Sequence, residues 1–189
     1  MKTVPRAVKL TYDDFVHFPD DGKRHELIDG EHYVTPSPRP KHQVIVGNLY
    51  LVIASWLETH RLGRIYLSPL DVVMSPFDVV EPDLLYVAAA RLSEVMTDAN
   101  VQGAPDLAIE VASKGTRRRD ETIKKQLYER AMVQEYWIVD PEIDVMRVYR
   151  RDGRSFLRPV ELSRERGDVL RTALLPGFDL PLARVFRDT

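Results

Sequence analysis

Apolar positions recur at helical spacing in two long stretches of the chain. From residue 42 to residue 60 they fall at Ile45, Leu49, Val52, Ile53, Trp56 and Leu57. This spacing places them on one stripe and predicts an amphipathic helix. The stretch from Thr116 to Met132 predicts a second helix in the same way. Thr11, with Asp14 three residues later and Pro19 beyond, predicts a short capped helix near the N-terminus.

Short β-prone runs predict the strands. They are RHELIDGEHYV, RIYLSPLDVVMS, DVVEPDLLYVA, PDLAIEV and EYWIVD, with VMRVYRR and SFLRPVEL after residue 144, and RLSEVM predicts a short helix. Asp29-Gly30 predicts a hairpin, because a type I′ turn needs positive φ at both central positions. Residues 105–140 form a βαβ unit, whose strands should be parallel. The pattern therefore predicts an α/β fold, a single domain over residues 1–189 with a mixed β-sheet flanked by helices.

Composition adds limits to this picture. Hydrophobic residues make up 44% of the chain and charged residues 30%, which is typical of a soluble globular protein. There is no cysteine, so disulfides and thiolate metal sites are excluded. The N-terminal segment MKTVPRAVKLTYDD lacks the apolar region of a secretory signal, and no apolar run approaches the ~20 residues of a membrane span. We therefore expect a cytoplasmic protein with no membrane partner.

Charge restricts how the chain could contact nucleic acid. The formal net charge is −2, whereas a protein that coats nucleic acid is basic overall. A contact therefore requires a local patch, and Lys114, Arg117, Arg118 and Arg119 supply one just after the strand PDLAIEV. Open α/β sheets bind ligands at the carboxyl ends of strands, and a helix N-terminus there favours phosphate. A solvated arginine run is the alternative.

Two acids on neighbouring strands form the candidate catalytic pair. Side chains alternate along a strand, so Glu110 shares a face with Asp106 and with small alanines that leave room for a metal or phosphate. Asp83 opens a strongly apolar strand, where a charge is rare unless it is paired or binds metal. Asp106 lies ~13 Å from Glu110 along the strand, too far for one ion. We therefore pair Asp83 with Glu110; an ordinary buried strand is the alternative.

A catalytic lysine is missing from its usual place. Metal-dependent nucleases usually carry it two residues after the second acid, where this chain has Ala112. In the next helix, Asp120, Lys124 and Tyr128 are four residues apart and share one face. Lys124 is therefore the candidate to reach Glu110, supported by Asp120 and Tyr128. A lysine that merely extends along the surface is the alternative.

Other polar residues receive structural assignments. Lys125 lies four residues after Glu121 and four before Glu129, so it is expected to form surface ion pairs. His25 and His42 each lie near an element boundary without a second histidine at ligand spacing, so capping or structural roles are expected.

Six segments of this sequence resemble a large bacterial family of restriction-endonuclease-like proteins within the PD-(D/E)xK nuclease superfamily. The segments are HELIDGE, PSPRPKHQVIVGNL, EPDLLYV, PDLAIEVAS, TRRRDETIKKQLYERAMVQEYWIVDP and LLPGFDLPL. The resemblance covers roughly residues 10–185 and implies a restriction-endonuclease-like core. It places acids at Glu26, Asp83 and Glu110 and moves the lysine to Lys124. The family usually has proline where this chain has Lys114, so the choice between Lys114 and Lys124 as the catalytic lysine stays open.

The resemblance implies hydrolysis of DNA phosphodiester bonds with Mg²⁺, for which Mn²⁺ can substitute. Asp83 and Glu110 would bind the ion directly, with the Val111 carbonyl as a third ligand, because Mg²⁺ takes a few protein oxygens and keeps several waters. Glu26 would hold a water or a second ion from the rim of the site. Lys124 would orient the water or neutralise charge on the phosphate.

Two functions remain open at this point. One is a metal-dependent DNA endonuclease, and the other is a catalytically inactive nuclease-fold module that binds nucleic acid or a protein partner. All four candidate catalytic residues are present, which favours the enzyme. Because a duplex has two strands, cleavage of both predicts a homodimer with C₂ symmetry.

Overall fold

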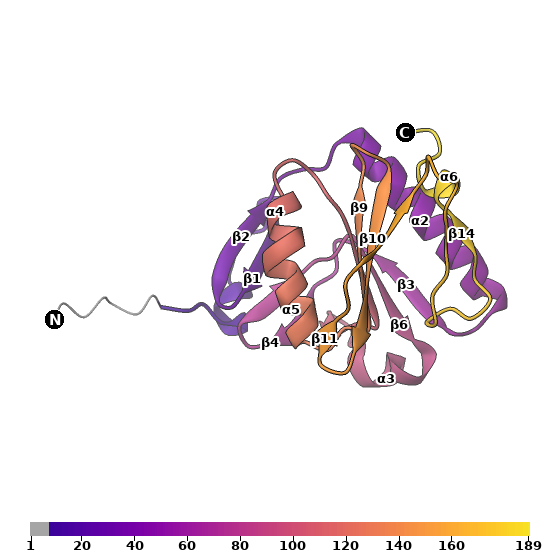
Figure 1. The fold of residues 1–189 in the computed structure, drawn as a ribbon. Helices are drawn as coiled ribbons and strands as arrows, with labels where there is room; N and C mark the ends of the chain where they lie inside the picture. Colours follow the sequence, from indigo (N-terminus) through magenta and orange to yellow (C-terminus); the bar gives the residue numbers. More distant parts are fainter. Residues whose placement is uncertain (1–7) are drawn as a thin grey trace.

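A computed structural model describes residues 8–189 (Figure 1). The helices are α1 (Tyr12–Phe15), α2 (Pro40–Thr59), α3 (Leu92–Val95), α4 (Arg117–Arg119), α5 (Lys125–Arg130) and α6 (Leu182–Val185). The first seven strands are β1 (Arg24–Ile28), β2 (Glu31–Thr35), β3 (Gly63–Leu67), β4 (Val72–Ser75), β5 (Asp78–Val80), β6 (Leu84–Ala88) and β7 (Val101–Gln102). The remainder are β8 (Leu107–Val111), β9 (Glu135–Asp140), β10 (Val145–Asp152), β11 (Ser155–Phe156), β12 (Val160–Ser163), β13 (Val169–Leu170) and β14 (Leu180–Pro181).

The central sheet has the order β11-β10-β9-β8-β6-β3, with β12 also paired to β10. Strands β8 and β9 are parallel, whereas β6 runs antiparallel to β8. The mixed α/β fold and the parallel βαβ unit are therefore confirmed. Because β8 and β9 are parallel, their carboxyl ends lie at the same edge of the sheet, which is the edge where Glu110 approaches the end of its strand.

A second sheet, of order β2-β1-β5-β4-β7, lies beside the first. Its β1–β2 hairpin turns at Asp29 and Gly30, whose φ angles are 53° and 75°, as the type I′ turn requires. A side chain at Gly30 would bring its Cβ to 2.6 Å from Lys9 Cβ, so only glycine fits. The division into two sheets is not predicted from the sequence, because strand pairing depends on contacts between distant residues.

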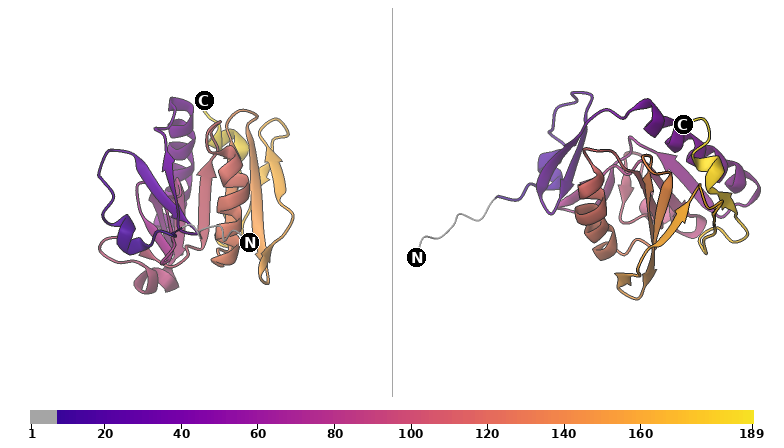
Figure 2. Two further views of the ribbon diagram at one scale, coloured as in Figure 1. Left: turned by 90° about the vertical axis from the view of Figure 1, so that its left-hand side faces the viewer. Right: turned by 45° about the horizontal axis from the view of Figure 1, so that its top comes forward.

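Side chains on the two faces of the central sheet enter different cores. Leu107, Ile109 and Val111 of β8 pack with α2 and the C-terminal segment, while Ala108 and Ala112 pack with α5 and the second sheet. This confirms the alternation expected along the strand. The two views of Figure 2 show α2 and the α4–α5 helix on opposite sides of the central sheet.

The helix expected from Thr116 to Met132 forms, but it is not uniform. It begins as α4, passes through a π-helical turn at Asp120–Lys124, and continues as α5. Single π turns inside α-helices are rare and occur often at functional sites. The turn carries both Asp120 and Lys124, which are buried.

Other elements either agree with the sequence pattern or are too short to produce one. The N-terminal helix has the expected capping box, in which Thr11 and Asp14 bond each other's backbone. Strands β7, β13 and β14 have two residues each and are too short to give a periodic signal. The expectation about a secretory signal rests in part on residues 1–7, which lie outside the described residues. None of the described helices combines the length and apolar character that crossing a bilayer demands.

Candidate nuclease site

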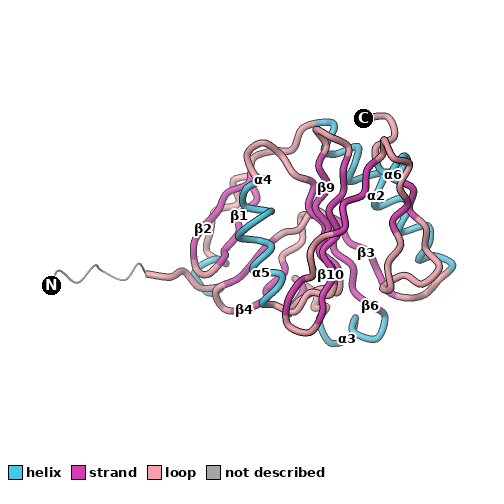
Figure 3. The backbone as a smooth tube through the Cα atoms, in the orientation of Figure 1, coloured by secondary structure: helices cyan, strands magenta, loops and turns pink. Residues whose placement is uncertain are grey.

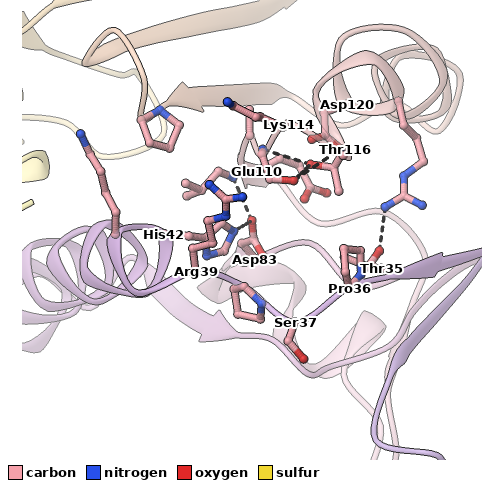
Figure 4. A pocket seen from close by; sticks show the side chains of 18 of the residues that line it. Thr35, Pro36, Ser37, Arg39, His42, Asp83, Glu110, Lys114, Thr116 and Asp120 are labelled. Carbon is pink, nitrogen blue, oxygen red and sulfur yellow. Dashed lines mark hydrogen bonds and ion pairs between the residues drawn. The ribbon is translucent and has the colours of Figure 1, made fainter.

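A cavity of about 580 Å³ opens at the carboxyl ends of β8 and β9. Its walls are the segment after β2, the first turn of α2, and the segment between β8 and α4 (Figure 4). The segment after β2 and the segment between β8 and α4 run along the same side of the molecule in Figure 3. Asp83, Glu110, Val111 and Lys124 all line this cavity. The fold thus brings together residues from β6, β8 and the π turn that are far apart in the chain.

Lys124 lies at the bottom of the cavity between two carboxylates. Its Nζ is 2.7 Å from Glu26 Oε1 and 2.8 Å from Glu110 Oε1. Tyr128 donates its hydroxyl to the same Glu110 oxygen at 2.8 Å. The lysine is 3% exposed, so it is held in place and does not extend over the surface. The shared face expected for Lys124 and Tyr128 therefore points at Glu110, and Asp120 adds negative charge beside Lys124.

Asp83 forms a second buried cluster against the same strand. Its Oδ1 accepts a hydrogen bond from Arg24 at 2.9 Å, and its Oδ2 contacts His42 Nε2 at 3.1 Å. The backbone N–H of Val111 donates to Oδ2 at 2.8 Å. In an extended strand the N–H and the C=O of one residue point to the same side of the strand. The Val111 carbonyl therefore faces the same side as its N–H, which is the side of Asp83. Burial raises the pKa of Asp83, but His42 and Arg24 outweigh it and hold the pKa at about 2.

Glu110 is electrostatically different from Asp83. Burial raises its pKa to about 8, and Asp120, Asp83 and Glu26 add repulsion, although Lys124 opposes the shift. The pKa of Lys124 is also raised, since three carboxylates outweigh its desolvation. For Glu26, Lys124 and Arg119 outweigh desolvation and lower the pKa. The cluster therefore holds Lys124 charged while Glu110 retains a proton near neutral pH.

The placement of Glu26 corrects one expectation. It was expected at the rim, but it is 1% exposed and lies beneath Lys124. Its Oε1 also accepts the backbone N–H of Glu81 at 3.1 Å. The β1–β2 hairpin packs over the π turn, so β1 faces the interior and not the solvent.

The basic segment after β8 is divided between interior and surface. Arg117 pairs with Asp140, with Nη2 and Oδ1 2.7 Å apart. Arg119 donates to Thr35 at 2.7 Å and lies 3.5 Å from Glu26. These two arginines bond to protein groups in this structure, and the nucleic-acid contact expected of the four basic residues stays a prediction. Two remain exposed at the cavity mouth or beside it: Lys114 and Arg118.

Two further details differ from the sequence expectations. Lys125 makes no ion pair with Glu121 or Glu129 in the described structure; its Nζ lies 5.3 Å from the Tyr149 ring centroid, while Glu121 bonds Arg147. His25 is not isolated. Its Nδ1 is 2.9 Å from His32 Nε2 across the hairpin, where the two rings stack. The first difference arises from residues distant in sequence, Tyr149 and Arg147, and the second from the pairing of the two strands of the hairpin.

Three residues of the site escaped sequence reasoning: Arg24, His42 as a partner of Asp83, and Glu81. A signal existed for Arg24, because it lies two residues before Glu26 on one strand and therefore shares its face. His42 looked like a lone histidine, since its partner is 41 residues away. Glu81 is buried with Oε2 unpaired, and burial with repulsion from Asp71 raises its pKa to about 7.

The donor set fits a divalent cation. Five carboxyl groups and three permanent cations interact here: Glu26, Glu81, Asp83, Glu110 and Asp120, with Arg24, Arg119 and Lys124. If all of these groups were ionised, the cluster would carry two excess negative charges. The acids with raised pKa values retain protons and thereby reduce this excess. No three His, Asp or Glu side chains are preset around one point among residues 8–189. A cation would therefore bind two carboxylates, one carbonyl and several waters, which suits Mg²⁺.

Comparisons with known proteins identify the family and the fold of this chain. The model of one protein family, described as "Uma2: Putative restriction endonuclease", matches residues 12–183. No curated protein matches the chain. A crystal structure titled as a "putative nuclease belonging to DUF820" from Anabaena variabilis shares the fold, with a TM-score of 0.79 and 21% identity over 94% of this chain and 97% of that one. The chain belongs to the Uma2 family of restriction-endonuclease-like proteins.

Proposed function

We propose that this protein is a Mg²⁺-dependent endonuclease that hydrolyses phosphodiester bonds in DNA. The observation that carries the proposal is the buried Lys124 held between Glu26 and Glu110 in the cavity that Asp83 also lines. A lysine buried between two carboxylates carries a large desolvation penalty. Membership of a restriction-endonuclease-like family supports nuclease chemistry as the reason that this lysine is buried here. Asp83, Glu110 and the Val111 carbonyl would hold the cation, which lowers the pKa of a bound water and polarises the phosphoryl oxygen.

The protein groups perform the remaining tasks. Lys124 is fixed by two carboxylates and Tyr128 by its bond to Glu110, so the ammonium needs no reorganisation when charge develops on a phosphate. Oδ1 of Asp83 accepts only Arg24 among the described residues, and a carboxylate oxygen has two lone pairs, so one remains for a ligand. Oε2 of Glu110 accepts no hydrogen bond from the residues described.

Phosphate binding falls to the mouth of the cavity. Helix α2 starts there without a side-chain cap, so its free N–H groups and dipole favour an anion. Lys114 has a side chain that is 75% exposed and lies 3.9 Å from Glu142. We expect Lys114→Ala to weaken DNA binding and to reduce the slope of log Kd against log salt by about one, as loss of one phosphate contact predicts. Lys125→Ala should leave the slope unchanged, as measured by fluorescence anisotropy.

Incubation of the purified protein with plasmid and labelled oligonucleotides tests the activity directly, in Mg²⁺, in Mn²⁺ and in EDTA. Cleavage with either metal, lost in EDTA, is the expected result. Titration calorimetry should detect Mg²⁺ binding that disappears in Asp83→Ala, accompanied by proton release from Glu110, whose pKa is about 8. Equal binding of the metal by wild type and Asp83→Ala would contradict the proposed ligand set.

An inactive module that binds nucleic acid or a protein partner is the competing function. It would show binding without cleavage under every metal condition. If the substrate is duplex DNA, the proposal adds a homodimer, because two strands require two sites. Light scattering that finds only monomer at high micromolar concentration would contradict that part and favour nicking.

A further inference from the structure

A second cavity, of about 550 Å³, adjoins the first. The two share Arg24, His42 and Asp83 on the floor, and the segment Thr35–Pro38 lines both. Asp83 therefore lies where the two cavities meet. A ligand group placed at Asp83 has space on both sides of it.

The segment between the cavities is stiff. Residues 35–40 read Thr-Pro-Ser-Pro-Arg-Pro, so every residue is either a proline or the residue before one. Proline fixes its own φ and restricts the preceding residue to extended conformations. This wall is therefore preformed, and the boundary between the two cavities keeps its shape.

The reacting groups are almost fully buried. Asp83 is 2% exposed, Glu110 4% and Lys124 3%. Cavities of a few hundred Å³ hold a molecule of drug size. One nucleotide is of that size. An intact duplex is much larger, since its major groove alone is ~12 Å wide. A phosphate on the outside of an intact duplex would remain above the groups that must reach it.

The lining of the second cavity suits a nucleoside. Apolar surface comes from Pro36, Pro38, Val46, Leu67 and Pro69. Gln43 and Ser68 add uncharged hydrogen-bonding groups, which can meet the edge of an unpaired base. Charged groups line this cavity as well: Asp20, Lys23, Arg24, Glu81 and Asp83. The first cavity has the exposed Lys114 at its mouth, where a phosphate can bind. The second cavity thus offers apolar surface and partners for a base edge beside a cavity that offers a cation for phosphate.

We infer that the site takes an unpaired nucleic-acid strand, with the scissile phosphate beside Asp83 and Glu110 and a neighbouring nucleoside in the second cavity, in preference to an intact duplex. This inference rests on the proposed function and specifies its substrate. Enzymes that must reach a nucleotide stacked inside a duplex either act on single strands or extrude the nucleotide from the duplex. Extrusion costs free energy, and this cost is smallest where the base is already unpaired.

Three labelled DNAs of one sequence test the inference: a single strand, a perfect duplex, and a duplex with a central unpaired bubble. With Mg²⁺, we expect the single strand and the bubble to be cut at least about tenfold faster than the duplex, with cuts in the bubble confined to the unpaired stretch. Equal or faster cutting of the perfect duplex overturns the inference while leaving the proposed function intact.

Paired tryptophan variants locate the strand. Ser37→Trp fills the boundary of the two cavities, whereas Ser55→Trp places the same side chain on an exposed turn of α2 that lines neither. Ser37→Trp should slow single-strand cutting at least about tenfold, and Ser55→Trp should not. If Ser37→Trp melts early, Gln43→Trp in the second cavity replaces it. Equal rates for the cavity variant and the control overturn the inference.

Binding distinguishes the two proposals if no DNA is cut. Fluorescence anisotropy at one salt concentration should then show the single strand bound at least about tenfold more tightly than the duplex, and weakened by Ser37→Trp. That outcome contradicts the nuclease but supports the strand site. Equal or tighter duplex binding contradicts the strand site.

Discussion

Two Pro-Asp motifs, Pro82-Asp83 and Pro105-Asp106, each lie at the start of a strand, and their surroundings are alike over a short range. Asp83 accepts the backbone N–H of Val111 at 2.8 Å, and Asp106 accepts that of Ala88 at 2.8 Å. Each aspartate also pairs with an arginine at 2.9 Å. Sequence and local contacts therefore give little basis for telling one motif from the other.

The difference lies in what the sheet places nearby. Strands β6 and β8 are antiparallel, so their first residues lie at opposite edges. Asp83 meets the end of β8 with Glu110, the π turn with Lys124, and the cavity. Asp106 meets the end of β6, where Arg91 pairs with it and also bonds the Ala104 carbonyl. Asp83 thus lines the candidate site, whereas Asp106 anchors the start of its strand.

Exchanging each aspartate for its isosteric amide gives the largest contrast. Asp83→Asn should reduce cleavage by about 10²–10³-fold, because the neutral amide is a poorer ligand than the carboxylate for the proposed cation, which stabilises the charge that develops on the phosphate. Asp106→Asn should leave the cleavage rate within about twofold of wild type. It should instead lower stability by about 1.5–3 kcal/mol, the value of a hydrogen bond to a charged group. Cleavage assays and thermal melting of both variants measure this, and equal activity losses would contradict the assignment.

The adjacent lysines separate site from surface on one helix. Lys124→Met leaves Glu26 and Glu110 buried without their cation, which should cost about 3–5 kcal/mol. Cleavage should fall at least about 10²-fold while DNA affinity changes little, because the lysine acts on the transition state. Lys125→Met should cost less than about 1 kcal/mol, the range of an exposed cation–π contact.

The destabilisation caused by Lys124→Met should depend on pH in a defined direction. A carboxyl group with a raised folded-state pKa stabilises fully below its unfolded value, and the stability is lost as pH rises through the folded value. The pKa of Glu110 is about 8, so Lys124→Met should be more destabilised above that pH than near pH 5. Melting across this range measures it. A deficit for Lys124→Met that is the same at both ends would show that the lysine is not the counter-charge.

The residue before each Pro-Asp gives the smallest expected effect. Position 104 is alanine, whereas position 81 is a glutamate whose pKa burial raises to about 7. Wild type should therefore lose stability as pH rises through about 7, and Glu81→Gln, in which position 81 does not titrate, should lose less. The variant should match wild type near pH 5 and exceed it near pH 8 by on the order of 1 kcal/mol, or about 2–4 °C in Tm. Parallel melting profiles would contradict this.

Local patterns predicted much of the fold. The Asp29-Gly30 turn, the amphipathic α2 and the parallel β8–β9 pair follow from backbone sterics and side-chain periodicity, which neighbouring residues determine. The separation into two sheets does not follow, because β1 pairs with β5 about fifty residues away in sequence. The family resemblance indicated Glu26, but its burial under Lys124 depends on that pairing.

The sequence by itself determined which residue types were available: three acids and a lysine at family spacing, a stiff proline segment, and a basic run after β8. Tertiary structure decided what each one does. It directed Arg117 and Arg119 to protein carboxylates, left Lys114 and Arg118 exposed, and placed Arg24 and His42 against Asp83. The physical reason is that the energy of a charge pair depends on the distance between the two charges and on their burial: it weakens with separation and strengthens as water is excluded. Spacing along a strand or helix fixes that distance only for near neighbours.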